Sequence, residues 1–427
     1  MNNESNESVK VNNINKLYKY YIKSLVILVS IFFVLIVLIN YTINPYSIFN
    51  SYLAQQLTIN KPFYSTHTRM GKAYIVRKLK PKSIILGASR AETGLNPEHP
   101  GFKNKPVYNL SLAGANIYET YRYFQHMNNL TKLVQIVLSI DFFQFNANKA
   151  VTPDFLESRL SISYKGSQVG YPLQEVVSVL SSIDGLVASI ETIFKQNNSR
   201  QIILNNGQQN HTANKMKIVK QGGHRNAFLQ SEEDYIKYIY FPKPAKKFDF
   251  SSVETGTDSF LIFRLLIEEC YRKDIDTKIL ISPSHARQWE TLAASGLWDK
   301  WEFWKKELVR LNEEAAVKYG RKPFALWDFS GYNTYTTESV PPIGDTRTEM
   351  KWYWESSHYR SELGDIVLDR IFNVSRPERT VADDFGVLLT AESLNRHLLK
   401  IRSTREKYRL SHLNDVAEIN DLKNQKK

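Results

Sequence analysis

The chain has 427 residues, a net charge of +13 and a single cysteine, Cys270. One cysteine excludes an internal disulfide and a cysteine-based metal cluster. The basic residues are dispersed and no nucleic-acid-binding module is visible, so the charge favours an anionic membrane surface or an acidic glycan over nucleic acid as a partner.

An apolar run dominates the N-terminal part of the chain. Residues 23–44 contain about twenty residues without a charge, enough to cross the roughly 30 Å hydrocarbon core of a bilayer as a helix. Four lysines precede the run, and the next basic residue after it is Lys61. The positive-inside rule therefore predicts a single-pass plasma (inner) membrane protein with a cytoplasmic N-terminus and a periplasmic or extracellular main domain. A cleaved signal peptide is the alternative, but no small-residue cleavage site follows the run.

The flanks of this run have their own composition. Residues 1–22 are rich in Asn and acidic at their start, and we expect them to form a disordered cytoplasmic tail. Residues 45–80 are polar with some helical character, and we interpret them as a connecting segment.

Five apolar runs that end in small or polar residues predict buried strands. They lie at residues 83–89, 107–114, 133–143, 278–285 and 324–331. Because the runs do not alternate and helical stretches separate them, we expect a parallel sheet covered on both faces, an α/β three-layer sandwich over residues 81–375. Ligands in such folds gather at the carboxyl ends of the strands.

Two further regions depart from this rhythm. Residues 151–252 are rich in Asn, Gln, Ser and Gly, and we interpret them as an insertion, part helix and part loop, that walls or covers the strand ends. Residues 376–427 are expected to form a helical extension. Within it the apolar residues follow approximate helical spacing, which predicts a long amphipathic helix: Leu394, Leu398, Ile401, Tyr408 and Leu413. Packing on the domain is favoured over docking to a membrane or partner, since lysines and aromatic residues do not strongly flank this apolar stripe.

Two motifs carry the predicted chemistry. In the first, residues 84–90 form a strand that leads into a Gly-containing turn and presents Ser89, near N–H groups that can stabilise an oxyanion. In the second, Glu355 precedes His358 by three residues on a loop that enters a helix. The acid can hold one ring nitrogen while the other accepts the proton of a serine hydroxyl. A helix-capping serine and a structural histidine are the alternatives.

Taken together, a serine after the first strand and acid-x-x-His before the last helix resemble the SGNH (GDSL-like) hydrolase superfamily. The resemblance is to its membrane-anchored branch, which includes alginate-type O-acetylation proteins and the D-alanyl transfer protein of teichoic-acid synthesis. It implies that Ser89 is the nucleophile, His358 the base and Glu355 its acid partner. It also implies that Gly114 contributes an N–H to the oxyanion hole.

One part of the resemblance fails. The family's third block, G-x-N-D, is here Ser139-Ile140-Asp141-Phe142, so the asparagine that completes the oxyanion hole is missing. Asn116 or Asn109 is a substitute, as is the Ser89 N–H acting with Gly114. An anionic Asp141 would disfavour an oxyanion, so we expect it to orient another group or bind substrate.

Other side chains near the strand ends are candidates for binding substrate. Arg90 suits an anionic or hydroxyl-rich polymer, and Trp354 is placed beside His358 to stack on a sugar ring. His285 either binds substrate or is a packed, hydrogen-bonded residue. No nucleotide-binding loop or metal-binding motif is present, so we expect no cofactor and no metal.

Three functions follow from these features. The first is a membrane-anchored O-acyltransferase, most simply an O-acetyltransferase, that acts on an exported polysaccharide; the resemblance implies a multi-spanning membrane acyltransferase as acyl donor. The second is an acyl-ester hydrolase of surface glycan or lipid with the same triad. The third is a non-catalytic assembly component of a polysaccharide export or modification system.

Overall fold

The computed structural model describes residues 2–49, 60–196 and 202–424. The chain divides into two compact units. One unit joins the N-terminal residues, up to Thr66, to residues 171–201, and the other contains residues 67–170 and 202–427. The insertion predicted at residues 151–252 is therefore shared between the two units. The connecting segment predicted at 45–80 lies partly outside the described residues, and its last part, from His67 on, belongs to the second unit.

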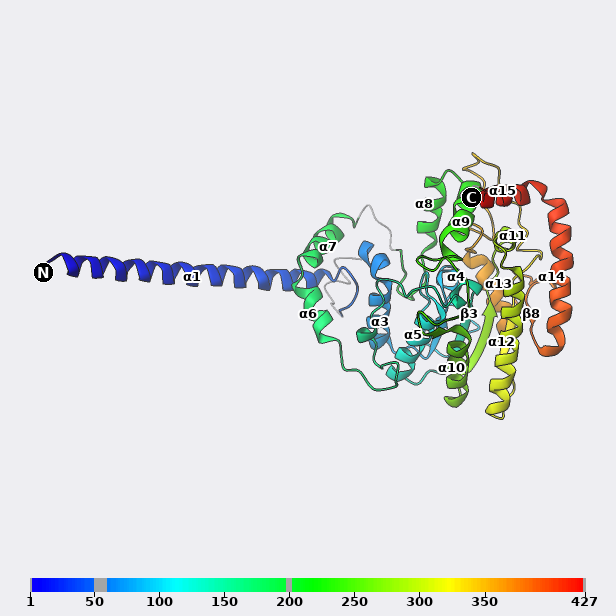
Figure 1. Cartoon of the computed structure of the whole chain (residues 1–427), viewed down its shortest axis with the longest axis horizontal. Helices are drawn as coiled ribbons and strands as arrows, with labels where there is room; N and C mark the ends of the chain where they lie inside the picture. The colour runs from blue at the N-terminus through cyan, green and yellow to red at the C-terminus, as the bar shows by residue number, and fades with distance from the viewer. Residues whose placement is uncertain (1, 50–59, 197–201, 425–427) are drawn as a thin grey trace. The chain divides into compact units, whose positions relative to one another are not determined.

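The first unit is built on the helix α1 (Asn2–Ile43), drawn in blue in Figure 1. Its apolar part is long enough to cross a membrane. Two short helices, α6 (Leu173–Ser181) and α7 (Ile183–Phe194), pack on α1 and meet at a bend of 64°. Among the described residues this bent pair passes the same test of length and composition if it is counted as one span. The prediction of a disordered tail was wrong, because α1 begins at Asn2.

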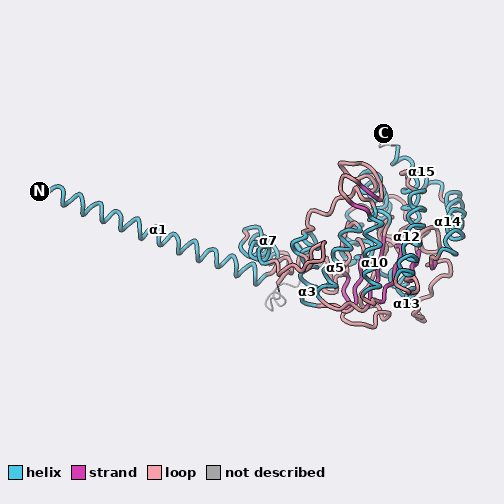
Figure 2. The backbone as a smooth tube through the Cα atoms, turned by 60° about the horizontal axis from the view of Figure 1, so that its bottom comes forward, coloured by secondary structure: helices cyan, strands magenta, loops and turns pink. Residues whose placement is uncertain are grey.

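The second unit contains a six-stranded sheet in the order β2-β1-β3-β6-β7-β8. Figure 2 draws the strands in magenta between the helices. The strands are β1 (Ser83–Leu86), β2 (Val107–Asn109), β3 (Gln135–Ile140), β6 (Asp276–Ile281), β7 (Ala325–Asp328) and β8 (Val387–Leu388). All neighbouring pairs are parallel except β7 and β8. The α/β class and the five parallel strands are as predicted. The two-residue antiparallel edge strand β8 was not predicted.

Alternate side chains of the strands face two separate layers of helices, since successive residues of a strand point to opposite faces. Ile84, Ile136 and Ile279 lie in the core cluster of one face, whereas Ile85, Val137 and Leu280 lie in that of the other. The first cluster includes residues of α3 (Thr68–Leu79), α5 (Ile117–Leu130), α10 (Ser259–Arg272), α12 (Trp298–Lys318) and α14 (Ala391–Ser411). The second includes residues of α4 (Ser89–Gly94), α9 (His224–Asp234) and α13 (Ser361–Phe372). Both faces are buried, which explains the continuous apolar runs.

The remaining elements lie around this sandwich. Helices α8 (His211–Lys220) and α9 come from the predicted insertion, and α11 (Ala286–Ala294) follows β6. Helix α14 buries four of the five apolar residues that suggested it, and α15 (Leu413–Asn424) packs on α9 and α11. The fifth residue, Leu413, is exposed at the start of α15.

Candidate active site

Ser89 lies at the carboxyl end of β1, as the first residue of α4. Gly87 makes this turn possible, because a Cβ there would stand 2.8 Å from the Ser139 carbonyl oxygen of the neighbouring strand. Ser89 is partly exposed, whereas Ala88 and Arg90 on either side are buried. The strand order places β1 beside β3 at the point where successive connections reverse direction, the usual position of a ligand site in open α/β sheets.

His358 lies on a tight loop that leads into α13. The loop is closed by backbone hydrogen bonds from Trp354 N–H to the His358 carbonyl (3.0 Å) and from Arg360 N–H to the Trp352 carbonyl (2.7 Å). These two bonds fix the backbone on both sides of the histidine. The loop is about 270 residues away from Ser89 in sequence.

The structure brings together the three predicted catalytic side chains. Ser89 Oγ lies 2.8 Å from His358 Nε2, and His358 Nδ1 is hydrogen-bonded to Glu355 Oε1. Glu355 also accepts hydrogen bonds from the backbone N–H groups of Ser357 (2.8 Å) and His358 (3.0 Å). Glutamate thus fits the position usually held by aspartate, because its longer side chain folds back onto its own loop.

The electrostatics of this group favour an ionised Glu355 that accepts a hydrogen bond from His358 Nδ1. Burial raises the pKa of Glu355, but His358 and the hydrogen bonds from Ser231 and the Ser357 N–H outweigh it and lower the pKa to about 2. A carboxylate accepts hydrogen bonds and donates none, so His358 Nδ1 must be the donor. The Nε2 lone pair then points at the Ser89 hydroxyl, which is the arrangement that general-base catalysis requires.

The predicted oxyanion-hole residues differ in their contacts. Gly114 is partly exposed with φ +68°, and its N–H donates no hydrogen bond to any residue in the described ranges. Its loop adjoins that of Ser89, since Leu112 N–H donates to the Gly87 carbonyl at 3.0 Å. Together with the N–H of Ser89 in the first turn of α4, Gly114 offers two backbone donors.

The prediction for Asn116 has to be corrected. Asn116 caps α5: its Oδ1 accepts from the Glu119 N–H at 2.9 Å, and its amide donates to the Lys149 carbonyl at 3.0 Å. Asn109, the other candidate, is fully buried and its amide donates to the Ala91 and Leu95 carbonyls. Both side chains hold backbone groups, which explains why neither is directed to the nucleophile.

Arg90 and Asp141 form a buried ion pair of 2.8 Å instead of a substrate-binding surface. Arg90 Nε donates to the carbonyl and hydroxyl of Ser357, and Arg90 Nη2 donates to the Tyr235 hydroxyl at 3.1 Å. Arg90, which directly follows Ser89, therefore links the N-terminal turn of α4 to the loop of His358. Asp141 orients Arg90, one of the two roles predicted for it, and both charged groups are too buried to contact a polymer.

His285 and Trp354 are also packed residues. Packing is one of the two roles predicted for His285, whereas it contradicts the role in substrate binding predicted for Trp354. His285 Nδ1 accepts from the Arg287 N–H, and Nε2 is 2.7 Å from the Glu338 carbonyl. Burial lowers the pKa of His285 to about 3, so it is neutral and both nitrogens are occupied. Trp354 is 4% exposed and is covered by Arg360, whose guanidinium lies 4.5 Å from the ring centroid.

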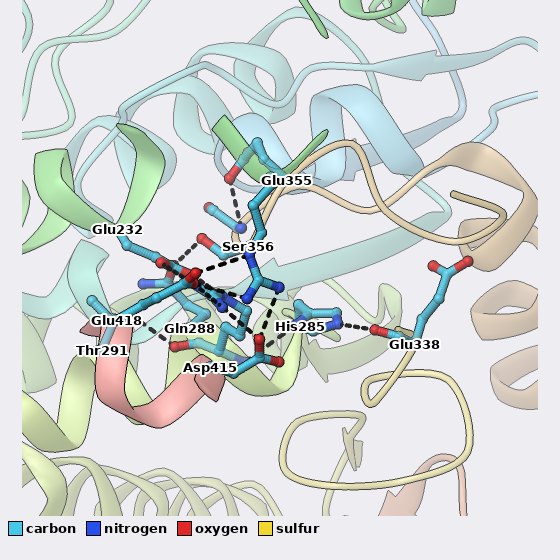
Figure 3. Close-up of polar contacts among 12 residues, drawn as sticks. Glu232, His285, Gln288, Thr291, Glu338, Glu355, Ser356, Asp415 and Glu418 are labelled. Carbon is cyan, nitrogen blue, oxygen red and sulfur yellow. Dashed lines mark hydrogen bonds and ion pairs between the residues drawn. The ribbon is translucent and has the colours of Figure 1, made fainter. Parts of the chain in front are cut away.

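A cluster of charged side chains lies beside Glu355 and Ser356 of the His358 loop (Figure 3). Arg287 of α11 is paired with Glu232 of α9 (2.7 Å) and with Asp415 and Glu418 of α15 (2.8 and 2.9 Å). From the same helix, Gln288 accepts a hydrogen bond from Ser356 Oγ at 3.2 Å. At the N-terminal end of α11, the His285 N–H donates to the Ser356 carbonyl at 3.0 Å.

The sequence did not indicate Ser231, Tyr235 or Ser357 as contributors. Ser231 and Tyr235 come from the polar insertion, where no strand end marks their position. Ser357 lies inside the acid-x-x-His motif, and that position of the motif signalled no role. No protein-family model matches the chain, and a search of curated proteins found no match either.

Proposed function

We propose that this protein is a membrane-anchored O-acyltransferase of the SGNH type that transfers an acyl group, most simply acetyl, to an exported cell-surface polysaccharide. The observation that carries the proposal is the alignment of Ser89, His358 and Glu355, with 2.8 Å between Ser89 Oγ and His358 Nε2. The apolar part of α1, preceded by lysines of the same helix, supports anchorage in the plasma membrane with the second unit outside.

In the proposed reaction, His358 Nε2 takes the Ser89 proton as Oγ attacks the carbonyl carbon of an acyl donor. Collapse of the tetrahedral intermediate breaks the bond to the leaving group, which receives the proton from His358, and leaves an acyl ester on Ser89. A sugar hydroxyl then loses its proton to Nε2 and attacks the ester. The second tetrahedral intermediate then collapses to the O-acylated sugar, and His358 returns the proton to Ser89 Oγ. Glu355 keeps Nδ1–H oriented throughout.

The negative charge of the two tetrahedral intermediates would be stabilised by backbone donors. The N–H groups of Gly114 and Ser89 are the pair that this chain offers, since the asparagine amides serve as structural donors. Two well-placed donors without a side-chain amide still stabilise an oxyanion by several kcal/mol. The missing asparagine is therefore compatible with catalysis.

The first test is chemical. The full-length protein in detergent is treated with a serine-reactive fluorophosphonate and digested, and the labelled peptide is identified by mass spectrometry. Labelling at Ser89 that is lost in His358→Ala supports an activated nucleophile. The exposed Ser403, which has no hydrogen bond to a histidine of the described residues, is the control for non-specific labelling. Absence of labelling at Ser89 would favour the non-catalytic assembly role.

The second test separates transfer from hydrolysis in cells. Acyl-ester content of the surface polymer is compared in the wild type, Ser89→Ala and a deletion. Loss of esters in both mutants supports transfer, and a gain in both supports the hydrolase. A deletion phenotype that Ser89→Ala lacks supports the assembly role. Dependence of transfer on a multi-spanning acyl donor is tested by deleting that partner and measuring the same esters.

A further inference from the structure

The bend between α6 and α7 is held by one polar residue of α1. Asn40 is fully buried, and its amide donates to the carbonyls of Leu180 (2.9 Å) and Ser182 (3.1 Å). Its Oδ1 accepts a hydrogen bond from Ser189 Oγ at 3.0 Å. Asn40 thereby contacts the end of α6, the residue at the bend and the middle of α7, so these three helices form one unit.

The position of these bonds is informative about the surroundings. A helix end leaves carbonyl groups without intrahelical partners, and in water the solvent satisfies them. In hydrocarbon no solvent is available, and an unsatisfied carbonyl costs several kcal/mol, so a bend is tolerated where protein groups supply the hydrogen bonds. Asn40 supplies them here from within the apolar part of α1.

The outward faces of the two short helices are apolar. On α7 the exposed side chains Ile183, Val187, Ile190 and Phe194 follow a 4-3-4 spacing, which puts them on one stripe. On α6, Leu173 and Val177 are exposed four residues apart. Phe194 is 78% exposed, an unusual state for a large aromatic residue in water. Both helices pack on α1, whose own apolar side chains are exposed as far as Tyr41.

The depth of the pair follows from the place of Asn40 in α1. Asn40 is three residues before the end of the helix at Ile43, which corresponds to about 5 Å along its axis. Asp184 and Lys195, near the two ends of α7, are exposed and suit a polar boundary. Amphipathic helices of this kind bury their apolar face about 5–10 Å into the region between headgroups and acyl chains.

We propose that α6 and α7 form a collar around the end of α1 that is immersed in lipid acyl chains at the edge of the bilayer core. The proposal rests on the proposed anchorage of α1 in the membrane. Lipid is the occupant because the stripe lies on helices that pack on the end of α1, whose exposed apolar side chains would themselves face lipid. The collar gives the protein a second membrane contact, about 140 residues away from the first in sequence.

The experiment measures immersion directly on the full-length protein reconstituted in liposomes of phosphatidylcholine and phosphatidylglycerol. In a Cys270→Ala background, single cysteines are introduced by Val187→Cys (collar), Phe32→Cys (α1) and Ser403→Cys (α14) and are spin-labelled. Collision with molecular oxygen, which concentrates in lipid, is compared with collision with a water-soluble nickel chelate. We expect oxygen to dominate at Val187 and Phe32, and the nickel chelate to dominate at Ser403.

Each other outcome overturns a defined part of the proposal. A water-like Val187 label beside a lipid-like Phe32 label would disprove the collar and leave the anchor intact. A water-like Phe32 label would disprove the anchorage and the collar with it. A Val187 label protected from both reagents would mean that protein covers the stripe, which also overturns immersion in lipid.

A second variant tests the role of Asn40. In the Val187→Cys background, Asn40→Leu removes the hydrogen-bond partners at the bend, and we expect nickel accessibility at the label to rise several-fold as the pair leaves the hydrocarbon. Ile39→Leu, the adjacent position of α1, is the matched control and is expected to change nothing. Equal accessibility in Asn40→Leu and the control would contradict the assigned role of Asn40.

Discussion

Gly364 of α13 lies directly against the Gly94 carbonyl group of α4, so close that a Cβ on Gly364 would stand 1.8 Å from the oxygen. Helix α4 begins with Ser89, and α13 begins three residues after His358. The contact between two glycines therefore sets the separation of the two elements that carry the nucleophile and its base.

We predict that Gly364→Ala separates α4 from α13 and lowers both stability and activity. Overpacking of this kind costs about 1–3 kcal/mol, and a displacement near 1 Å at the triad reduces the rate about 10²-fold. Thermal unfolding and the rate of fluorophosphonate labelling at Ser89 measure the two effects. Gly170→Ala is the matched control, because a Cβ at Gly170 has no atom within 4 Å. Equal labelling rates in both variants would contradict the positioning role.

The sequence predicted the triad because the position of each residue follows from simple rules. Ser89 follows a buried strand, and Glu355 and His358 share a loop before an amphipathic helix, so the parallel topology alone brings them to one edge. The same reasoning failed for Asn116 and Trp354, and it did not decide between the two roles of His285. Their side chains satisfy backbone carbonyls, cap helices or pack under Arg360, and such contacts depend on local geometry that a residue's place in the sequence does not reveal.

Other features depend on long-range packing and were equally beyond prediction. The division of the insertion between two units follows from Asn40 binding the bend of α6 and α7, which lies about 140 residues further along the chain. The pairing of Arg90 with Asp141 joins residues of adjacent strand ends. Their positions after predicted strands indicated that Arg90 and Asp141 lie near the site. Only their burial in the structure shows that they hold the loop instead of facing a substrate.

Replacing Glu355 by glutamine is predicted to show how far catalysis depends on the carboxylate charge, because the side chain keeps its shape. Glu355→Gln retains the shape but removes the carboxylate that fixes the Nδ1–H tautomer of His358, and we expect the labelling rate at Ser89 to fall by roughly 10³–10⁴-fold. A fall of less than tenfold would mean that the carboxylate does not orient His358. Glu362→Gln, an exposed acid in the following helix, is the control.

The lowered pKa of Glu355 predicts that the stability of the protein depends on pH. The pKa of Glu355 is about 2 in the folded protein and near 4.5 when unperturbed, so its ionised form stabilises the fold above about pH 4.5. This contribution is lost as the pH falls from 4.5 toward 2. We expect the difference in the free energy of unfolding between the wild type and Glu355→Gln to shrink from pH 6 to pH 3, measured by urea denaturation. A constant difference would contradict the lowered pKa.

Asp141→Asn is predicted to destabilise the protein rather than weaken substrate binding. The substitution leaves the buried Arg90 guanidinium without its counter-charge, and breaking a buried ion pair costs about 3–5 kcal/mol. Asp274→Asn breaks the exposed pair with Arg321 and is expected to cost less than about 1 kcal/mol. A higher KM with unchanged stability would instead favour a role of Asp141 in binding substrate.

Helix α15 is predicted to be coupled to the loop that carries Glu355 and His358. The double variant Asp415→Asn, Glu418→Gln leaves Arg287 paired with Glu232 and removes the carboxylates that face Arg225 at 2.8 and 3.0 Å. We expect α15 to loosen, with a loss of about 1–3 kcal/mol. The His285 N–H donates to the Ser356 carbonyl, so loosening of α15 should reach the loop through α11. We therefore expect faster amide hydrogen exchange at His285 and at residues 355–360. Glu406→Gln, in an exposed pair of α14, is the control. A lower unfolding temperature with unchanged exchange in the loop would mean that α15 stabilises the domain without positioning His358.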